Sequence, residues 1–185
     1  LSIFSYYRCK TASVGGVYIT LGVSMNDAAP ITRQIEPELL ELLGSFIVKW
    51  SFVEVCVSDL FVLLTRGDPG SMIVVTGSIS TSTLTDWIRT LVEAHKKTPH
   101  DLVNEINDVL SEIDYLRSER NILIHGLWVT PGPKNSVIVS TAKLGRNEVI
   151  RERVVTAADL HVLIDETLEV ASKLRALVKS IVPMG

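Results

Sequence analysis

Apolar residues recur at alternating steps of four and three between Glu36 and Thr65, which is the spacing of one face of a helix. Pro37 suits the first turn of such a helix, and the run Gly67–Gly70 ends the pattern. The stripe consists of Leu39, Leu43, Phe46, Trp50, Val53, Val57, Leu60 and Leu64. Further apolar residues lie off this stripe. We therefore expect a helix that is central, or that also lies at a subunit interface.

A second helical pattern covers residues 84–97, and either Ser82 or Thr83 is expected to cap its start. The stretch before it is ambiguous, because Met72–Val75 fits either a strand or the beginning of a short helix. The hydroxyl-rich run at residues 78–83 has no glycine-lysine pattern for phosphate binding, and it predicts a loop.

The clearest helical pattern begins near Asp101 and carries an apolar stripe with the same spacing. Its positions are Leu102, Ile106, Val109, Ile113, Leu116, Arg120, Leu123 and Leu127. Arg120 therefore occupies a position where the pattern requires an aliphatic residue. An arginine on or beside a buried face costs free energy unless a group pairs with it, so its presence here indicates a functional role.

Two β-branched runs, at residues 137–139 and 149–155, flank Gly145–Asn147 and predict a β-hairpin. A last helical pattern follows it, beginning at Thr156 or Asp159. The sum predicts a mainly α fold. We expect an antiparallel bundle of about four helices, with a small β-hairpin inserted before the last helix.

The length of 185 residues suits one domain with a sizeable core, and 46% of the residues are hydrophobic. We expect a single helical domain over residues 31–185 and a poorly ordered segment over residues 1–30. Met25 is a candidate for the natural start of the protein, a hypothesis that the intact mass of the native protein tests.

Charge and cysteine content limit the expected binding partners and cellular compartment of this protein. A net charge of −3 gives no general attraction to nucleic acid or to an anionic membrane, so contact with RNA must rest on a local site. Cys9 and Cys56 make no disulfide framework, which indicates a reduced, cytoplasmic protein. Lys49, Glu54 and Asp59 interrupt the longest helical pattern, which argues against a membrane span.

Polar residues share one edge of the helix that carries Arg120, because Asp114, Arg117, Asn121 and His125 are spaced by three, four and four. Histidine is the general acid or base available near neutral pH, and the planar donors of arginine fit phosphate oxygens. Asparagine can orient the histidine or a substrate hydroxyl. No Asp, His and Cys cluster has the spacing of a metal site. This set suits metal-free attack of an RNA 2′-hydroxyl on the neighbouring phosphate.

In such a reaction His125 moves a proton, and Arg120 stabilises the charge of the transition state. Because one helix supplies one histidine, a second copy across a two-fold axis would bring a second pair to the same cleft. Arg117 is a candidate substrate-binding residue, although solvated or ion-paired arginines are common on helices.

The segment Arg120-Asn121-x-x-x-His125 resembles the R-x4–6-H signature of HEPN domains, late in a long helix and with a further helix after it. The resemblance covers about residues 35–182 and assigns Arg120, Asn121 and His125 as catalytic. It implies a homodimer with a metal-independent endoribonuclease site, RNA as substrate, no cofactor and, in many members, a cognate antitoxin or partner protein. Leu127 occupies the position of a tyrosine in one group of HEPN toxins, so regulation by modification of that tyrosine is not expected.

Two other interpretations stay open. Some HEPN domains lack nuclease activity, so the same cleft would serve a non-catalytic module that binds a nucleotide, an RNA end or a protein. In a purely structural interpretation, Arg120 pairs with a carboxylate and His125 caps the carbonyls of its own helix. The carboxylates considered are those of Glu119, Asp114, Glu54 and Asp59.

Overall fold

The computed structural model describes residues 35–95, 98–129, 136–143 and 149–181. All of these belong to one unit of the chain, Gln34–Gly185. The expected N-terminal segment over residues 1–30 and the hypothesis about Met25 lie outside the described residues.

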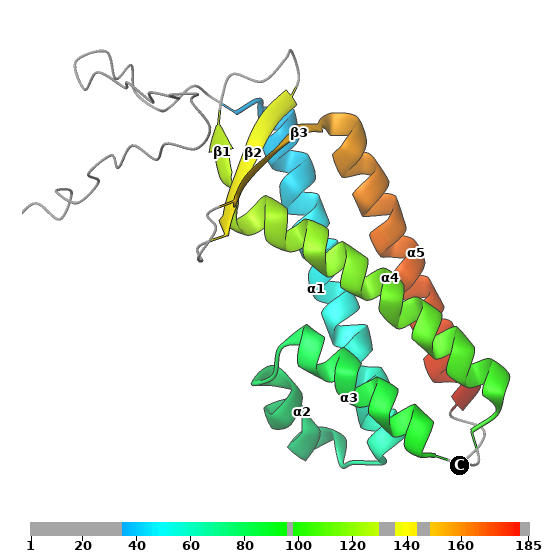
Figure 1. Ribbon diagram of the computed structural model, residues 1–185. Coiled ribbons are helices and arrows are strands. Elements are labelled where there is room, and N and C mark those ends of the chain that lie inside the picture. The colour runs from blue at the N-terminus through cyan, green and yellow to red at the C-terminus, as the bar shows by residue number, and fades with distance from the viewer. Residues whose placement is uncertain (1–34, 96–97, 130–135, 144–148, 182–185) are drawn as a thin grey trace, which may run out of the picture. The chain divides into compact units, whose positions relative to one another are not determined.

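Helix α1 (Pro37–Thr65) forms where the first apolar stripe lies, and it packs against two other helices, α3 and α5 (Figure 1). Its stripe is almost fully excluded from water at Phe46, Trp50 and Leu60. The helix ends at Arg66, which adopts a left-handed conformation with φ of 53°, and the Arg66 N–H donates to a carbonyl of the last turn. The burial of α1 against α3 and α5 confirms the expectation of a central helix.

The ambiguous stretch is a short helix, α2 (Pro69–Gly77), and not a strand. Asp68 caps it, because its carboxylate accepts from the backbone N–H of Ser71 at 2.8 Å. None of the α2 residues is buried, so a proline at the first turn and a good cap define this helix more than packing does.

Helix α3 (Thr81–Ala94) begins earlier than the apolar pattern predicted. Its cap is Ser80, and not Ser82 or Thr83, because the Ser80 hydroxyl accepts from the Thr83 N–H at 3.2 Å. The first turn of a helix tolerates hydroxyl residues, since its N–H groups lack helical partners, and apolar spacing alone cannot reveal such a turn.

Helix α4 (His100–His125) carries the predicted apolar stripe, but the helix ends at His125. Leu127 does not extend the stripe, because it lies in strand β1 (Leu127–Val129) and is 67% exposed. The chain changes direction at Gly126, whose N–H still donates to the Ile122 carbonyl at 2.9 Å. A short strand directly after a helix has too few residues for its own periodicity to show in the sequence.

The predicted hairpin is present as strands β2 (Ser136–Lys143) and β3 (Val149–Thr156), and β1 adds a third antiparallel strand to it. Strand β1 pairs with β2 so that Trp128 lies opposite Val139. The alternation of a half-buried sheet places Val137, Val139 and Val155 in the core.

Helix α5 (Ala157–Ile181) begins with a reciprocal cap. The Asp159 carboxylate accepts from the Thr156 N–H at 2.9 Å, and the Thr156 hydroxyl accepts from the Asp159 N–H at 3.2 Å. Both residues that the sequence offered as the start of this helix therefore contribute to it.

The mainly α fold class, with a small sheet before the last helix, is confirmed. The described residues contain five helices, since α2 adds one to the four that were expected. Figure 1 shows that α1 and α5 both run away from the sheet, whereas α4 runs back toward it. Among the described helices, none is long and apolar enough to cross a membrane.

Substitution Gly126→Ala will destabilise the fold, by about 1–3 kcal/mol, because a Cβ at Gly126 would meet the Val139 side chain and the Ile122 carbonyl. The matched control is Gly44→Ala in α1, where a Cβ meets nothing within 4 Å. Alanine has the higher helix propensity, so this control should gain about 0.5–1 kcal/mol. Urea unfolding of both variants measures the difference, and equal stabilities would contradict the packing described at Gly126.

The cap of α5 makes part of the stability depend on pH. Hydrogen bonds from the Thr156 N–H and hydroxyl lower the pKa of Asp159 below its ordinary value. A lowered pKa stabilises the fold above the pKa of the unfolded chain, and this contribution is lost as the pH falls through the folded pKa. We expect Asp159→Ala to cost about 1 kcal/mol at pH 7, and less in acid.

The control for this cap is Asp165→Asn, which removes an exposed carboxylate from the same helix. Urea unfolding at pH 7 and below pH 4 compares the two variants. An Asp159→Ala cost that stays the same at both pH values would show that the carboxylate charge does not contribute.

Candidate functional site

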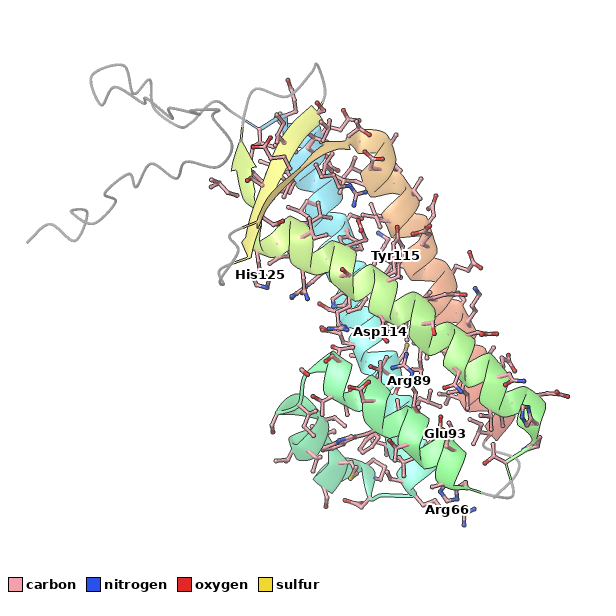
Figure 2. All side chains as sticks on the ribbon, in the orientation of Figure 1. Arg66, Arg89, Glu93, Asp114, Tyr115 and His125 are labelled. Carbon is pink, nitrogen blue, oxygen red and sulfur yellow. The ribbon has the colours of Figure 1, made fainter. Side chains whose placement is uncertain are left out.

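Helix α4 carries all four predicted site residues along its last turns, on the approach to the sheet. The side chains of Arg117, Arg120 and Asn121 are partly buried, and His125 is exposed. Figure 2 shows His125 at the end of α4 that meets the sheet. The polar edge predicted from the spacing is thus a real edge of α4, partly covered at one end and open at the other.

Arg120 makes no ion pair with any described residue. Its Nη1 donates to the Asn121 Oδ1 at 3.2 Å, while its Nε is buried and has no hydrogen-bond partner in the described part of the chain. Burying a guanidinium without a carboxylate costs free energy. The structural interpretation required such a carboxylate, and none of the described residues supplies it.

Two of the carboxylates considered for Arg120 are held by other arginines. Glu119 pairs with Arg153 of β3, and this pair ties α4 to the sheet. Asp114 accepts from Arg89 of α3 at 2.7 Å and from Arg117 at 3.1 Å. Figure 2 shows Asp114 and Arg89 between the two helices. Asp114 therefore positions Arg117 and leaves Arg120 without a counter-charge.

The remaining two carboxylates lie on α1. Glu54 accepts a hydrogen bond from the Thr81 hydroxyl at 2.9 Å, which links α1 to the start of α3. Asp59 is exposed and pairs with no described cation. Neither carboxylate forms an ion pair with Arg120.

The imidazole of His125 forms no hydrogen bond and no ion pair with the described residues. The last turn of α4 is closed by the backbone instead, because the Gly126 N–H donates to the Ile122 carbonyl. His125 therefore does not cap its own helix. An exposed imidazole that no described group engages is accessible to a bound molecule.

Two surface hollows adjoin this edge. The first, which we call the arginine hollow, has a volume of about 230 Å³. It is lined by Trp50, Glu54, Ser80, Thr81, Ser82, Arg117, Arg120 and Asn121. The second, the histidine hollow, has a volume of about 510 Å³. It is lined by Arg117, Ser118, Asn121, Ile122, His125 and Thr141.

Arg117 and Asn121 line both hollows, whereas Arg120 lines only the first and His125 only the second. The sequence predicted a single cleft for the catalytic set. In one chain, the structure divides that set between two adjoining hollows, with Arg117 and Asn121 at their boundary. Arg117 therefore has a more central place than the spacing along α4 indicated.

Sequence reasoning missed the groups that other elements bring to these hollows. Ser80, Thr81 and Ser82 form the cap and first turn of α3, and not the predicted loop, and they line the arginine hollow. Thr141 of β2 lines the histidine hollow. The serine and threonine run was visible in the sequence, but its nearness to α4 depends on tertiary packing.

No metal site accompanies the polar edge within the part of the chain that the structure describes, since it contains no cluster of three or more His, Cys, Asp or Glu side chains placed to hold an ion. In comparisons with protein-family models, curated proteins and solved structures, nothing matches this chain.

The missing ion pair of Arg120 has a measurable consequence. We expect Arg120→Met to change the free energy of unfolding by less than about 1 kcal/mol, or to raise it, because apolar packing replaces an uncompensated cation. The control is Arg153→Met, which leaves the Glu119 carboxylate, only 12% exposed, without its partner. That variant should lose about 2 kcal/mol. Urea unfolding measures both, and a larger loss for Arg120→Met would assign Arg120 a structural role.

Proposed function

We propose that this chain is a metal-independent endoribonuclease of the HEPN type, which acts as a homodimer. One observation carries the proposal: Arg120 is left without a carboxylate on the helix edge that also presents an unengaged His125. By contrast, Arg89 of α3, Arg117 of α4 and Arg153 of β3 each pair with a carboxylate. An unpaired guanidinium lowers stability in a free protein, but it stabilises the charge of a bound phosphate.

The chemistry that these groups support is attack of a 2′-hydroxyl on the adjacent phosphodiester. His125 accepts the hydroxyl proton while the 2′-oxygen bonds to phosphorus, and Arg120 neutralises charge on the phosphoryl oxygens. The bond to the 5′-oxygen then breaks, and that oxygen takes a proton from an acid. The products are a 2′,3′-cyclic phosphate and a 5′-hydroxyl. In this mechanism Asn121 orients the ribose hydroxyl or the imidazole.

A dimer serves this mechanism in two ways. It supplies a second imidazole as the acid, and it brings the Arg120 of one copy toward the His125 of the other, which a single chain holds in separate hollows. Apolar residues on the surface of α1 support self-association. Val48 is 71% exposed, and Phe52 and Val55 are also exposed on the same side of the helix.

The division of Arg120 and His125 between two hollows also favours a second candidate function. If the chain stays monomeric, this geometry suits a module that binds a nucleotide, an RNA end or a protein partner without cleaving it. Such a module would bind RNA and release no cyclic phosphate.

In either case the cellular role proposed is that of a cytoplasmic protein that acts on RNA. A toxin, with a cognate antitoxin as partner, or a defence component would fit the resemblance to HEPN domains. The buried free thiol of Cys56 is compatible with a reducing compartment.

The test is cleavage of single-stranded RNA by the full chain with a metal chelator present. We expect wild-type protein to leave cyclic-phosphate ends, and His125→Ala to lower the rate by about 100-fold or more, because it removes the proton acceptor. Arg120→Ala should lower the rate comparably. The matched control is His161→Ala, which removes an exposed histidine of α5 and should keep the wild-type rate.

Light scattering of the same samples gives the oligomeric state, and circular dichroism confirms that each variant is folded. Equal cleavage by His125→Ala and wild type would overturn the proposal. RNA binding without any cyclic-phosphate product would favour the binding module.

A further inference from the structure

We propose that the arginine hollow is a phosphate-binding subsite for single-stranded RNA, separate from the phosphate that reacts at His125. Its principal ligand is Arg117, and the start of α3 completes it with Ser82. This inference rests on the proposed function for the identity of the ligand as RNA. Binding of a phosphate group to the hollow is independent of catalysis, so the two can be tested separately.

The first support is the local charge. The arginine hollow is lined by two guanidinium groups, Arg117 and Arg120, and by one carboxylate, Glu54. Its charge is therefore positive in a chain whose net charge is −3. On a protein with a net negative charge, a cationic hollow attracts anions locally, because the rest of the surface does not attract them.

The second support is a set of hydrogen-bond donors without partners among the described residues. The Nε atoms of Arg117 and Arg120 are both buried, and neither donates to a described group. Arg117 is positioned through its Nη2, which donates to Asp114 at 3.1 Å, and Asp114 is in turn held by Arg89. We expect a phosphate oxygen in the hollow to accept from the Arg117 guanidinium, which provides a partner for this cation, while Arg120 stays assigned to the reacting phosphate.

The third support comes from α3, whose first turn lines the same hollow. The Ser80 hydroxyl is used by the helix cap, and the Thr81 hydroxyl is donated to Glu54. The Ser82 hydroxyl donates to no described group. The start of a helix of 14 residues adds a favourable dipole for an anion, in support of the two arginines.

The size of the hollow decides which part of a ligand it accepts. Its volume of about 230 Å³ is below the range of about 300–1,000 Å³ that is typical of pockets for whole small molecules. A phosphate group fits such a space, which is small for a whole nucleotide with its base.

The position of the hollow indicates why the ligand is a strand. Arg117 and Asn121 also line the histidine hollow, so a chain that reacts at His125 crosses this boundary and brings a neighbouring phosphate to the arginine hollow. A free phosphate would gain nothing from this continuity.

The main experiment measures binding of 2′-O-methyl RNA, which cannot be cleaved because it has no attacking hydroxyl. Fluorescence anisotropy gives its Kd for the full chain. Arg117→Gln should raise the Kd about fivefold or more. It should also reduce the slope of log Kd against log salt concentration by about one, because one phosphate contact is lost. Glu54→Gln should lower the Kd several-fold, because it removes the one carboxylate while its amide oxygen still accepts from Thr81.

These opposite directions separate ligand binding from a structural role, which would weaken binding in both variants. The control is Lys179→Gln, which removes an exposed cation that lines neither hollow. Circular dichroism checks that all variants fold. Kd values within twofold of wild type for both Arg117→Gln and Glu54→Gln would overturn the subsite.

A second readout uses inorganic phosphate alone. In NMR spectra of ¹⁵N-labelled protein, phosphate should shift the Nε–H signal of Arg117 and the amide signal of Ser82, and Arg117→Gln should remove the amide shift. No shift at these groups would mean that the hollow does not take phosphate. If instead the RNA oligonucleotide alone shifts them, a diester is the ligand and a free phosphate is not.

The two proposals fail in different ways. If His125→Ala abolishes cleavage while Arg117→Gln and Glu54→Gln both keep the wild-type Kd, the nuclease stands and the subsite falls. If Arg117→Gln and Glu54→Gln shift the Kd in opposite directions but no RNA is cleaved, the subsite stands and the nuclease falls.

Discussion

The burial of α1 between α3 and α5 is the constraint on which the rest of this fold depends. Trp50 and Phe46 are almost fully excluded from water, and apolar burial of this kind is the largest favourable term in folding. Helix α4 then buries Ile113 and Leu116 against the same core. Because a helix has fixed periodicity, burying that stripe places Arg117 and Asn121 at the border beside the start of α3. The polar edge is thus a geometric product of apolar packing.

The charged residues around this edge are used unevenly. Glu119 and Asp114 each hold an arginine, and these pairs connect α4 to the sheet and to α3. Arg120 donates a single hydrogen bond to the amide oxygen of Asn121, and its Nε donates to none of the described residues. Natural folds tolerate a buried cation without a hydrogen-bond partner where a ligand provides that partner. The missing hydrogen bond then destabilises only the free protein, because the complex forms it.

The fold was largely predictable, because α1, α4 and α5 bury long regular stripes that periodicity reveals. The pattern left α2 undecided between a strand and a short helix, because none of its residues is fully buried, and it missed β1, which is too short to show alternation. On the site, the spacing along α4 identified the polar residues but could not give their partners. The Glu119 partner lies 34 residues away and the Glu54 partner 27, and such pairings depend on tertiary packing. The separation of Arg120 and His125 into two hollows also depends on tertiary packing, so the spacing along α4 could not reveal it.

The junction between α4 and β1 gives His125 a particular mechanical situation. Gly126 has no room for a side chain, and the Trp128 indole N–H is held by the Leu123 carbonyl at 2.7 Å. The backbone that carries the imidazole is therefore clamped from both directions, while the ring itself is tethered to nothing described. Such a side chain can change rotamer about a fixed backbone position, so the imidazole can adjust to a bound molecule without any displacement of the chain.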